Sequence, residues 1–466
     1  MASKIYKTYF FFMPWARKAF WDPFWWAILF VVILFIPFLR PWGWFFLPMM
    51  LIVQLKELYL WWIMWDFTYA KFKWVVIEMI PPKEVLAPFK AMEDVFTSLW
   101  PIYDSGNWRE QWCEGEFAES AYWFSWEIVS AEGSVHFYLR CLAQHRRTIE
   151  SIIYGHYPEI EMREVPDYLK AIPQDIPNQE WDLYGEDWMF EKIDCYPIRT
   201  YEKFFEPQGE RISAEEKRID PMASLLEGLS RLGPGEHFWI QFITTPVVDS
   251  EVGLNAIAKK EIDRIARRPV KKEKTFLQDI GDLLYYLIMG PTKEGSGEKA
   301  TYKFLPRVME DEGDDNELML TPGEKEVLLG IEDKMKKPIF KCSVRGAYVA
   351  KRENWSGASK NAGRGYFGHF KTMHLNALRY TGDTRPKTHY LFRKRRAYFR
   401  ARKMFRNIVR RFPAMYPDMK AYTILLNSEE LATLFHFPNK LTGLVSPSVA
   451  RVESKRGGPP ENLPIE

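Results

Sequence analysis

The stretch that decides the fold is residues 121–141, which read AYWFSWEIVSAEGSVHFYLRC. Two runs rich in apolar and aromatic residues, 121–130 and 134–141, flank the short segment Ala131-Glu132-Gly133. Runs of this length on either side of a glycine-containing turn are typical of a β-hairpin. The stretch therefore predicts two antiparallel strands joined by a tight turn.

The sequence on either side extends this hairpin into a longer pattern. Residues 74–80 (WVVIEMI) predict a strand, and residues 87–100 carry apolar side chains at helical spacing. A second helix is expected at 145–154 and an alternating strand at 159–165. The resulting order, β-α-β-β-α-β, is the ferredoxin-like pattern, and it predicts a first α+β domain at 74–170.

A second α+β unit of similar order is expected at 185–430. Its predicted strands cover 188–196, 236–244, 338–350 and 420–426, and its predicted helices cover 222–232 and 322–336. Asp220-Pro221 and Thr321-Pro322-Gly323-Glu324 have the composition of helix starts. Insertions are expected at about 247–320 and 352–415. The first has predicted helices at 251–268 and 275–289 and the acidic run 310–317, which is typical of a solvated loop.

The N-terminal segment 1–73 differs in composition from the rest of the chain. Ten of the 19 Trp lie in the first 74 residues, and 24–39 and 41–55 contain no charged side chain. Because a membrane span needs about 20 apolar residues, this segment predicts a transmembrane helical hairpin that turns at 40–43. Lys56 and Glu57 weaken the second span, so a re-entrant hairpin remains an alternative.

Basic residues flank this hairpin on both sides, with Lys4, Lys7, Arg17 and Lys18 before it and Lys71 and Lys73 after it. Positive flanks stay on the cytoplasmic side. The expected location is therefore the inner (cytoplasmic) membrane, with two passes, both termini cytosolic and the lipid bilayer as a partner. The complete predicted fold class is α+β: an N-terminal transmembrane hairpin followed by two ferredoxin-like units with helical insertions.

Composition and motifs provide little support for catalysis. Net charge is +3, which excludes a globally basic nucleic-acid coat, and the four Cys form no CxxC pair. The sequence has no phosphate-binding P-loop, no metal-ligand spacing among its eight His and no G-x-S-x-G elbow. Residues 363–368 superficially match a dinucleotide fingerprint but are interpreted as a glycine-rich loop. We therefore predict no catalytic, cofactor-binding or metal-binding residue.

The sharpest local feature is residues 391–412, which read LFRKRRAYFRARKMFRNIVRRF. Ten basic residues and no acidic one occur between 393 and 411, namely Arg393, Lys394, Arg395, Arg396, Arg400, Arg402, Lys403, Arg406, Arg410 and Arg411. Without these ten, 54 basic residues face 61 acidic ones, so the positive charge of the chain is concentrated here. Apolar residues at three- and four-residue steps, from Tyr398 to Phe412, predict a helix that docks by one stripe.

Four interpretations of the basic helix stay open. Its Lys and Arg side chains could bind DNA phosphates, an anionic lipid surface or an acidic protein partner. They could also form a solvated helix face without a dedicated ligand.

The C-terminal sequence carries a resemblance to a known family. The segment 426–438, which reads LNSEELATLFHFP, and the tail pieces 451–455 and 459–464 are similar to the sequence that precedes the motor domain in type IV secretion and conjugation coupling ATPases of candidate-phyla bacteria and archaea. Residues 124–128 and 235–241 resemble strands of the membrane-proximal, non-motor region of that family.

This resemblance implies a function. The chain lacks the Walker motor that would follow the tail, so the resemblance implies a non-enzymatic subunit of a DNA translocation machine that serves as a platform for a separate hexameric-type ATPase. It also implies a homo-oligomeric ring. The expected docking segment is 431–466, with these contacts to the partner: Phe435, His436, Phe437, Pro438, Pro459, Pro460, Leu463 and Pro464. The alternatives are a membrane-tethered scaffold for anionic lipid or protein, and an enzyme whose site assembles only in the fold.

Overall fold

The computed structural model describes residues 31–41, 43, 59, 71–82, 88–102, 123–204, 220–267, 292–294, 301–303, 320–389, 391–413 and 422–438. The chain forms two compact units. Residues Gly253–Lys336 belong to the smaller unit, and the other described residues belong to the larger one.

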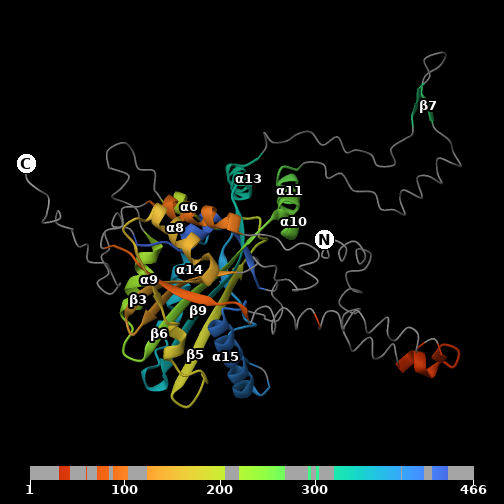
Figure 1. The fold of residues 1–466 in the computed structure, drawn as a ribbon. Coiled ribbons are helices and arrows are strands. Elements are labelled where there is room, and N and C mark those ends of the chain that lie inside the picture. The colour runs from red at the N-terminus through yellow and green to blue at the C-terminus, as the bar shows by residue number, and fades with distance from the viewer. Residues whose placement is uncertain are drawn as a thin grey trace, which may run out of the picture. The chain divides into compact units, whose positions relative to one another are not determined.

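The larger unit is built on one antiparallel sheet (Figure 1). Its described strands are β1 (Trp74–Ile80), β2 (Phe124–Ala131), β3 (Ser134–Leu142), β4 (Glu161–Val165), β5 (Trp181–Phe190), β6 (Glu236–Val247), β9 (Ile339–Lys351), β10 (Leu378–Tyr380) and β11 (Ile424–Asn427). They are ordered β10-β5-β9-β6-β2-β3-β1-β4, and β11 pairs with the first four residues of β9.

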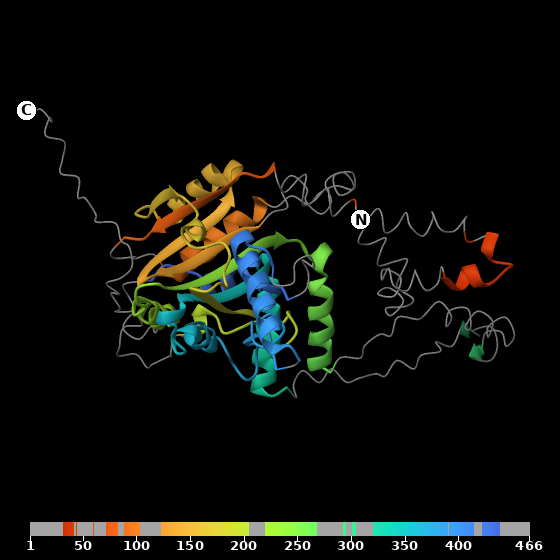
Figure 2. The same cartoon turned by 90° about the horizontal axis from the view of Figure 1, so that it is seen from below.

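Helices cover both faces of this sheet. The first face packs against α6 (Phe89–Leu99), α8 (Arg146–His156), α9 (Pro221–Ser230), α14 (Ala362–Gly368) and α16 (Ser428–Leu434), and together they enclose the main apolar core. The second face packs against α15 (Arg393–Arg410), which lies over the strands as the blue helix of Figure 2. Short helical segments lie at 100–102, 143–145, 168–171, 201–204, 249–252, 352–354 and 359–361.

The smaller unit contains two described helices, α11 (Leu254–Ile265) and α13 (Pro322–Met335), and the hairpin of β7 (Thr292–Glu294) and β8 (Thr301–Lys303). A capping box begins α13, because the Thr321 hydroxyl accepts from the Glu324 amide and the Glu324 carboxylate accepts from the Thr321 amide. This confirms the helix start predicted at Thr321. The predicted helix 275–289 and the acidic run 310–317 lie outside the described residues.

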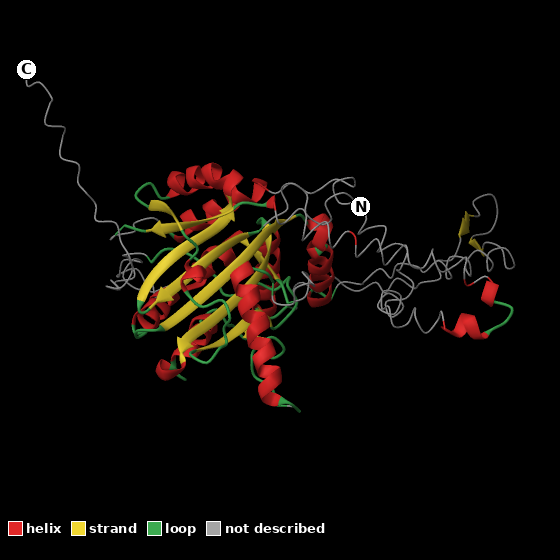
Figure 3. Cartoon of the chain, turned by 60° about the horizontal axis from the view of Figure 1, so that its bottom comes forward, coloured by secondary structure: helices red, strands yellow, loops and turns green. Residues whose placement is uncertain are grey.

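The prediction of two ferredoxin-like units is wrong. The expected element order at 74–165 is present as β1-α6-β2-β3-α8-β4, but these strands do not form a sheet of their own. β2 pairs with β6 over eight positions, from Phe124 opposite Thr244 to Ala131 opposite His237. One continuous sheet results, and Figure 3 shows its strands side by side. The physical reason is that β2 would otherwise expose a long apolar edge with unpaired backbone groups.

The prediction of a transmembrane hairpin is also overturned. Among the described residues, no helix is long and apolar enough to cross a membrane. Residues 31–35 are helical, but a bend and turn replace the helix at 36–39, around Pro37, whose ring lacks the amide donor that a continuous helix needs. The remainder of 24–65, apart from residues 40, 41, 43 and 59, lies outside the described residues. The predicted two-pass location in the inner membrane, with both termini cytosolic, is therefore not supported by the described residues.

Three smaller predictions also change. Residues 362–368 form helix α14 where a glycine-rich loop was expected. The strand expected at 188–196 is β5 at Trp181–Phe190. The sequence also favours Ser428 as the cap of a helix at 429–435, but Asn427 caps α16 in a capping box with Glu430. The Asp220 cap of α9 is confirmed by its side chain, which accepts from the Met222 amide.

The turn of the predicted β2–β3 hairpin consists of Glu132 and Gly133, with φ values of 52° and 89°. Two successive residues with positive φ are typical of the type I′ turn, whose twist matches that of the strands. The turn also packs closely on the connection that follows α9. A Cβ atom on Gly133 would lie 2.9 Å from both the Ser230 and the Leu232 carbonyl oxygens.

We predict that Gly133→Ala lowers the free energy of unfolding by about 1–3 kcal/mol, because the added methyl meets two rigid backbone oxygens in a strained conformation. The matched control is Gly155→Ala in α8, where a Cβ atom meets nothing within 4 Å. This control should be unchanged or more stable by under about 1 kcal/mol. Urea unfolding measures both, and equal stabilities of the two variants would contradict the assignment.

Candidate nucleic-acid interface

A row of polar side chains crosses the face of the sheet that α15 covers. The register places its members opposite one another on six neighbouring strands, in the order Glu78, Tyr138, Glu127, Gln241, Arg345 and Asp187. Glu127, Gln241, Arg345 and Asp187, at the centre of the sheet, are at most 2% exposed. Buried charges need partners, and the C-terminal end of α15 supplies the principal ones.

Arg411, which follows α15, is fully buried and pairs with two carboxylates. Its Nε donates to Glu127 Oε1 at 2.9 Å, and its Nη2 donates to Asp167 Oδ1 at 2.9 Å. The residue has a φ of 55°, an uncommon conformation for a residue with a side chain. The chain thus turns sharply at the helix end and directs this guanidinium into the sheet.

A second buried ion pair holds the next residue. Arg345 donates from Nε to Asp187 Oδ1 at 2.7 Å and from Nη1 to the Phe412 carbonyl at 3.2 Å. Gln241 also approaches the helix, since its Nε2 lies 3.4 Å from the Ile408 carbonyl oxygen. Three strands therefore bind the end of α15, which fixes the helix axis over the sheet.

The electrostatics of this pairing favour its charged form. Burial alone would raise the pKa of Asp167, but hydrogen bonds and the charge of Arg411 outweigh burial and hold the pKa below its usual value. Burial alone would lower the pKa of Arg411, but Glu127, Tyr168 and Asp167 raise it above its ordinary value. Tyr168 has a raised pKa because of burial and the nearby Glu127 carboxylate.

The predicted apolar stripe of α15 is present on the side that faces the sheet. Ala401, Phe405, Ile408 and Phe412 are buried, and Met404 joins them. The helix comes very close to β5, because a Cβ atom on Gly185 would lie 2.5 Å from Met404 Sδ. The expected docking by one stripe is thus confirmed, except that Tyr398 remains 47% exposed.

The ten predicted basic residues are divided by this docking. Eight of them are exposed: Arg393, Lys394, Arg395, Arg396, Arg402, Lys403, Arg406 and Arg410. Arg400 is half-buried, and its Nη1 donates to the carbonyl oxygens of Gly382, Arg385 and Lys387 at 3.3–3.5 Å. Arg411 is buried against the sheet, where it pairs with Glu127 and Asp167. The arrangement can therefore present eight cations to an anionic partner, while Arg400 and Arg411 position the helix.

A shallow depression of about 590 Å³ lies beside the basic helix. Tyr398 and Arg402 line it from α15, and Asp175, Asn178, Gln179 and Arg352 line it from two loops. Large apolar side chains are also exposed at the start of α15, with Leu391 at 76%, Phe392 at 72% and Phe399 at 56%. Sequence reasoning missed both features, because the loop 175–179 lies far from the helix in sequence.

The predicted partner-docking residues lie elsewhere. Phe435, His436 and Phe437 are at most 3% exposed, and Pro438 is partly buried. Both phenylalanine rings pack edge-on against Phe137. His436 donates from Nδ1 to the Ala432 carbonyl at 3.0 Å, and its Nε2 lies 3.0 Å from Asp220 Oδ1. These side chains belong to the core. Pro459, Pro460, Leu463 and Pro464 lie outside the described residues.

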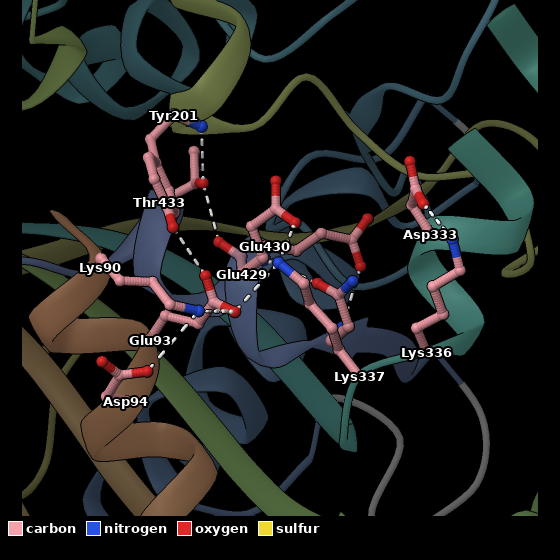
Figure 4. A network of polar contacts seen from close by, with 11 residues as sticks. Lys90, Glu93, Asp94, Tyr201, Asp333, Lys336, Lys337, Glu429, Glu430 and Thr433 are labelled. Carbon is pink, nitrogen blue, oxygen red and sulfur yellow. Dashed lines mark hydrogen bonds and ion pairs between the residues drawn. The ribbon is translucent and has the colours of Figure 1, made fainter. Parts of the chain in front are cut away.

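A polar network holds α16 against α6 (Figure 4). Its centre is Glu93, which is 2% exposed and accepts hydrogen bonds from Tyr201 Oη at 2.7 Å and Lys90 Nζ at 2.9 Å. Lys337 bridges Glu93 and Glu429 at 3.0 and 2.6 Å. Burial opposes ionisation, but these donors outweigh it and lower the pKa of Glu93. The network therefore binds the C-terminal segment to the helical layer.

No protein-family model matches this sequence, and no curated protein is significantly similar to it. Among the residues that the structure describes, no group of three or more His, Cys, Asp or Glu side chains is placed to hold a metal ion. Cys141, Cys195 and Cys342 are buried, and none of these three described cysteines is in a disulfide.

We predict that Arg411→Met lowers the free energy of unfolding by about 3–5 kcal/mol at pH 7, because Glu127 and Asp167 would lose their buried counter-ion. The matched control is Arg406→Met, on the exposed face of the same helix, which should change stability by under about 0.5 kcal/mol. Chemical denaturation measures both. A loss of stability as small as that of the control would rule out Arg411 as the counter-ion that holds Glu127 and Asp167.

The same pair predicts a pH dependence. Because the pKa of Asp167 is lower in the folded protein than its usual 3.8, its contribution to stability is present above about pH 4 and is lost as pH falls further. Wild type should therefore be destabilised by acid more steeply than Arg411→Met, in which Asp167 has lost the partner that lowers its pKa. Denaturation at pH 7 and pH 3 compares the slopes, and a steeper slope for the variant would contradict this account.

Proposed function

We propose that this chain is a non-enzymatic, nucleic-acid-binding platform in a DNA translocation machine of the type IV secretion or conjugation kind, acting beside an ATPase carried by another polypeptide. The observation that supports nucleic-acid binding is the exposed face of α15. It presents eight exposed Lys and Arg side chains, while the carboxylates of Glu127, Asp167 and Asp187 are paired with Arg411 and Arg345.

The dimensions of the helix suit a phosphate backbone. Eighteen residues at about 1.5 Å each give a helix about 27 Å long, and phosphates of one strand repeat about every 3.4 Å along the axis. About eight phosphates therefore fit along the helix. Each phosphate that a Lys or Arg neutralises releases condensed counter-ions, which makes such binding favourable at low salt and weak at high salt.

The platform role draws on the resemblance of 426–438 to the sequence before a motor domain. This segment is packed as β11 and α16, and Asn427, Glu430 and Lys337 hold it through hydrogen bonds and ion pairs. Contact with a separate ATPase would then use surfaces other than Phe435, His436 and Phe437, which are core residues. The rigid attachment of this segment to the sheet supports a scaffold role for the unit.

The test is a DNA-binding titration of the full chain by fluorescence anisotropy across a salt series. One variant changes Arg393, Arg395, Arg402 and Arg406 to Gln. The control variant changes Arg147, Lys170, Lys259 and Lys260 to Gln, which removes the same charge from exposed positions outside α15. We expect the α15 variant to lose affinity and to reduce the salt slope by about 3, because each phosphate contact contributes about 0.7–0.9.

The control should bind almost as wild type does. Equal losses in the two variants would indicate a general charge effect and would rule out α15 as the interface. If wild type binds no DNA at any salt concentration, the nucleic-acid function itself fails. Titration with anionic vesicles or with an acidic protein would then identify the ligand of the same face.

A further inference from the structure

The exposed face of α15 has large apolar rings among its charges. Phe392, Tyr398 and Phe399 are each about half or more exposed, at 72%, 47% and 56%. Arg395 lies over the Phe399 ring at 5.7 Å, so at least one ring is already in contact with a guanidinium. Exposed aromatic side chains contribute no binding energy on a helix face that only water contacts. They contribute when a ligand covers them.

The rings are also arranged in a specific way. Tyr398 and Phe399 have centroids 5.7 Å apart and planes inclined at 70°. Two flat ligands that stack on these rings must therefore lie in different planes. Bases within a duplex are stacked parallel and present only their edges, so their faces cannot reach the rings. Bases of a single strand can turn individually.

The depression beside α15 offers a place for one such base. Tyr398 lines it with an aromatic side chain, Arg402 lines it with a cation, and the exposed Gln179 lines it with a carboxamide that can both donate and accept. Arg352 is held by Asp182 at 3.2 Å and by the Asn178 carbonyl at 3.0 Å, so its position is fixed. Asp175, which also lines the depression, would repel a phosphate, and this favours a neutral base there.

From these observations we infer that α15 and the depression bind single-stranded nucleic acid. Phosphates follow the exposed cations, one base stacks on Tyr398 in the depression, and neighbouring bases stack on Phe399 and Phe392. The inference rests on the proposed function and names its substrate class. Basic and aromatic side chains also occur on helices that bind flat lipid surfaces. The inclination of 70° between the Tyr398 and Phe399 rings suits bases that turn individually, which favours the single strand.

The experiment compares two labelled ligands on the full chain by fluorescence anisotropy at one salt concentration: a 20-nucleotide oligo(dT) and a 20-base-pair duplex. The first variant is Tyr398→Leu, which keeps an apolar side chain and removes the ring. The matched control is Tyr154→Leu in α8, where the tyrosine is 40% exposed. A second variant, Gln179→Ala, tests the lining of the depression without changing the helix.

We expect oligo(dT) to bind more tightly than the duplex and Tyr398→Leu to weaken oligo(dT) binding by about tenfold, as loss of one stacked base does. The salt slope should stay unchanged, because stacking releases no counter-ions. Gln179→Ala should weaken oligo(dT) binding severalfold, and Tyr154→Leu should leave it unchanged.

The failures of the two proposals can be told apart. Equal affinity for oligo(dT) and duplex, with no effect of Tyr398→Leu, overturns the single-strand inference and leaves the proposed function standing. No binding of either ligand overturns both. Binding of vesicles with anionic lipid but of neither nucleic acid also overturns both.

Discussion

The pairing of β2 with β6 is the constraint on which the rest of the structure depends. Eight consecutive positions, from Phe124–Thr244 to Ala131–His237, join two four-stranded groups whose strand orders mirror each other about this pair. Successive pairs point to opposite faces of the sheet. Trp126 opposite Phe242 therefore faces the apolar core, and Glu127 opposite Gln241 faces α15. A shift by one residue would place Glu127 in that core.

The buried carboxylate of Glu127 then determines where the basic helix lies. A charge with no exposure is tolerated only with a counter-ion, and Arg411 is its counter-ion. Because Arg411 comes directly after α15, its position anchors the helix end over the sheet, and the apolar stripe from Ala401 to Phe412 fixes the rotation of the helix. The remaining cations must face outward. Two residues of one chemical type thus have opposite positions: Arg411 is buried and stabilises the fold, and Arg410 is exposed.

Much of this was predictable from local patterns. Aromatic and β-branched runs predicted the β2–β3 hairpin, the spacing of apolar residues predicted α15 and its docked side, and Thr321 and Asp220 predicted two helix starts. The division of the ten cations was not predictable, because their partners Glu127 and Asp167 are more than 240 positions away in sequence. A single acid inside the apolar strand 124–131 was the available signal. His436 was mistaken for a docking residue because its partner, Asp220, is also distant.

The sequence by itself determined the local elements and the concentration of positive charge, since helix spacing, turn composition and charge are properties of neighbouring residues. Only the tertiary structure decided that the strands form one sheet, because strand pairing is made between segments far apart in the chain. It also decided which arginines are exposed and that Tyr398 meets the loop 175–179 at a depression. These features depend on burial and on long-range contacts, which no local pattern contains.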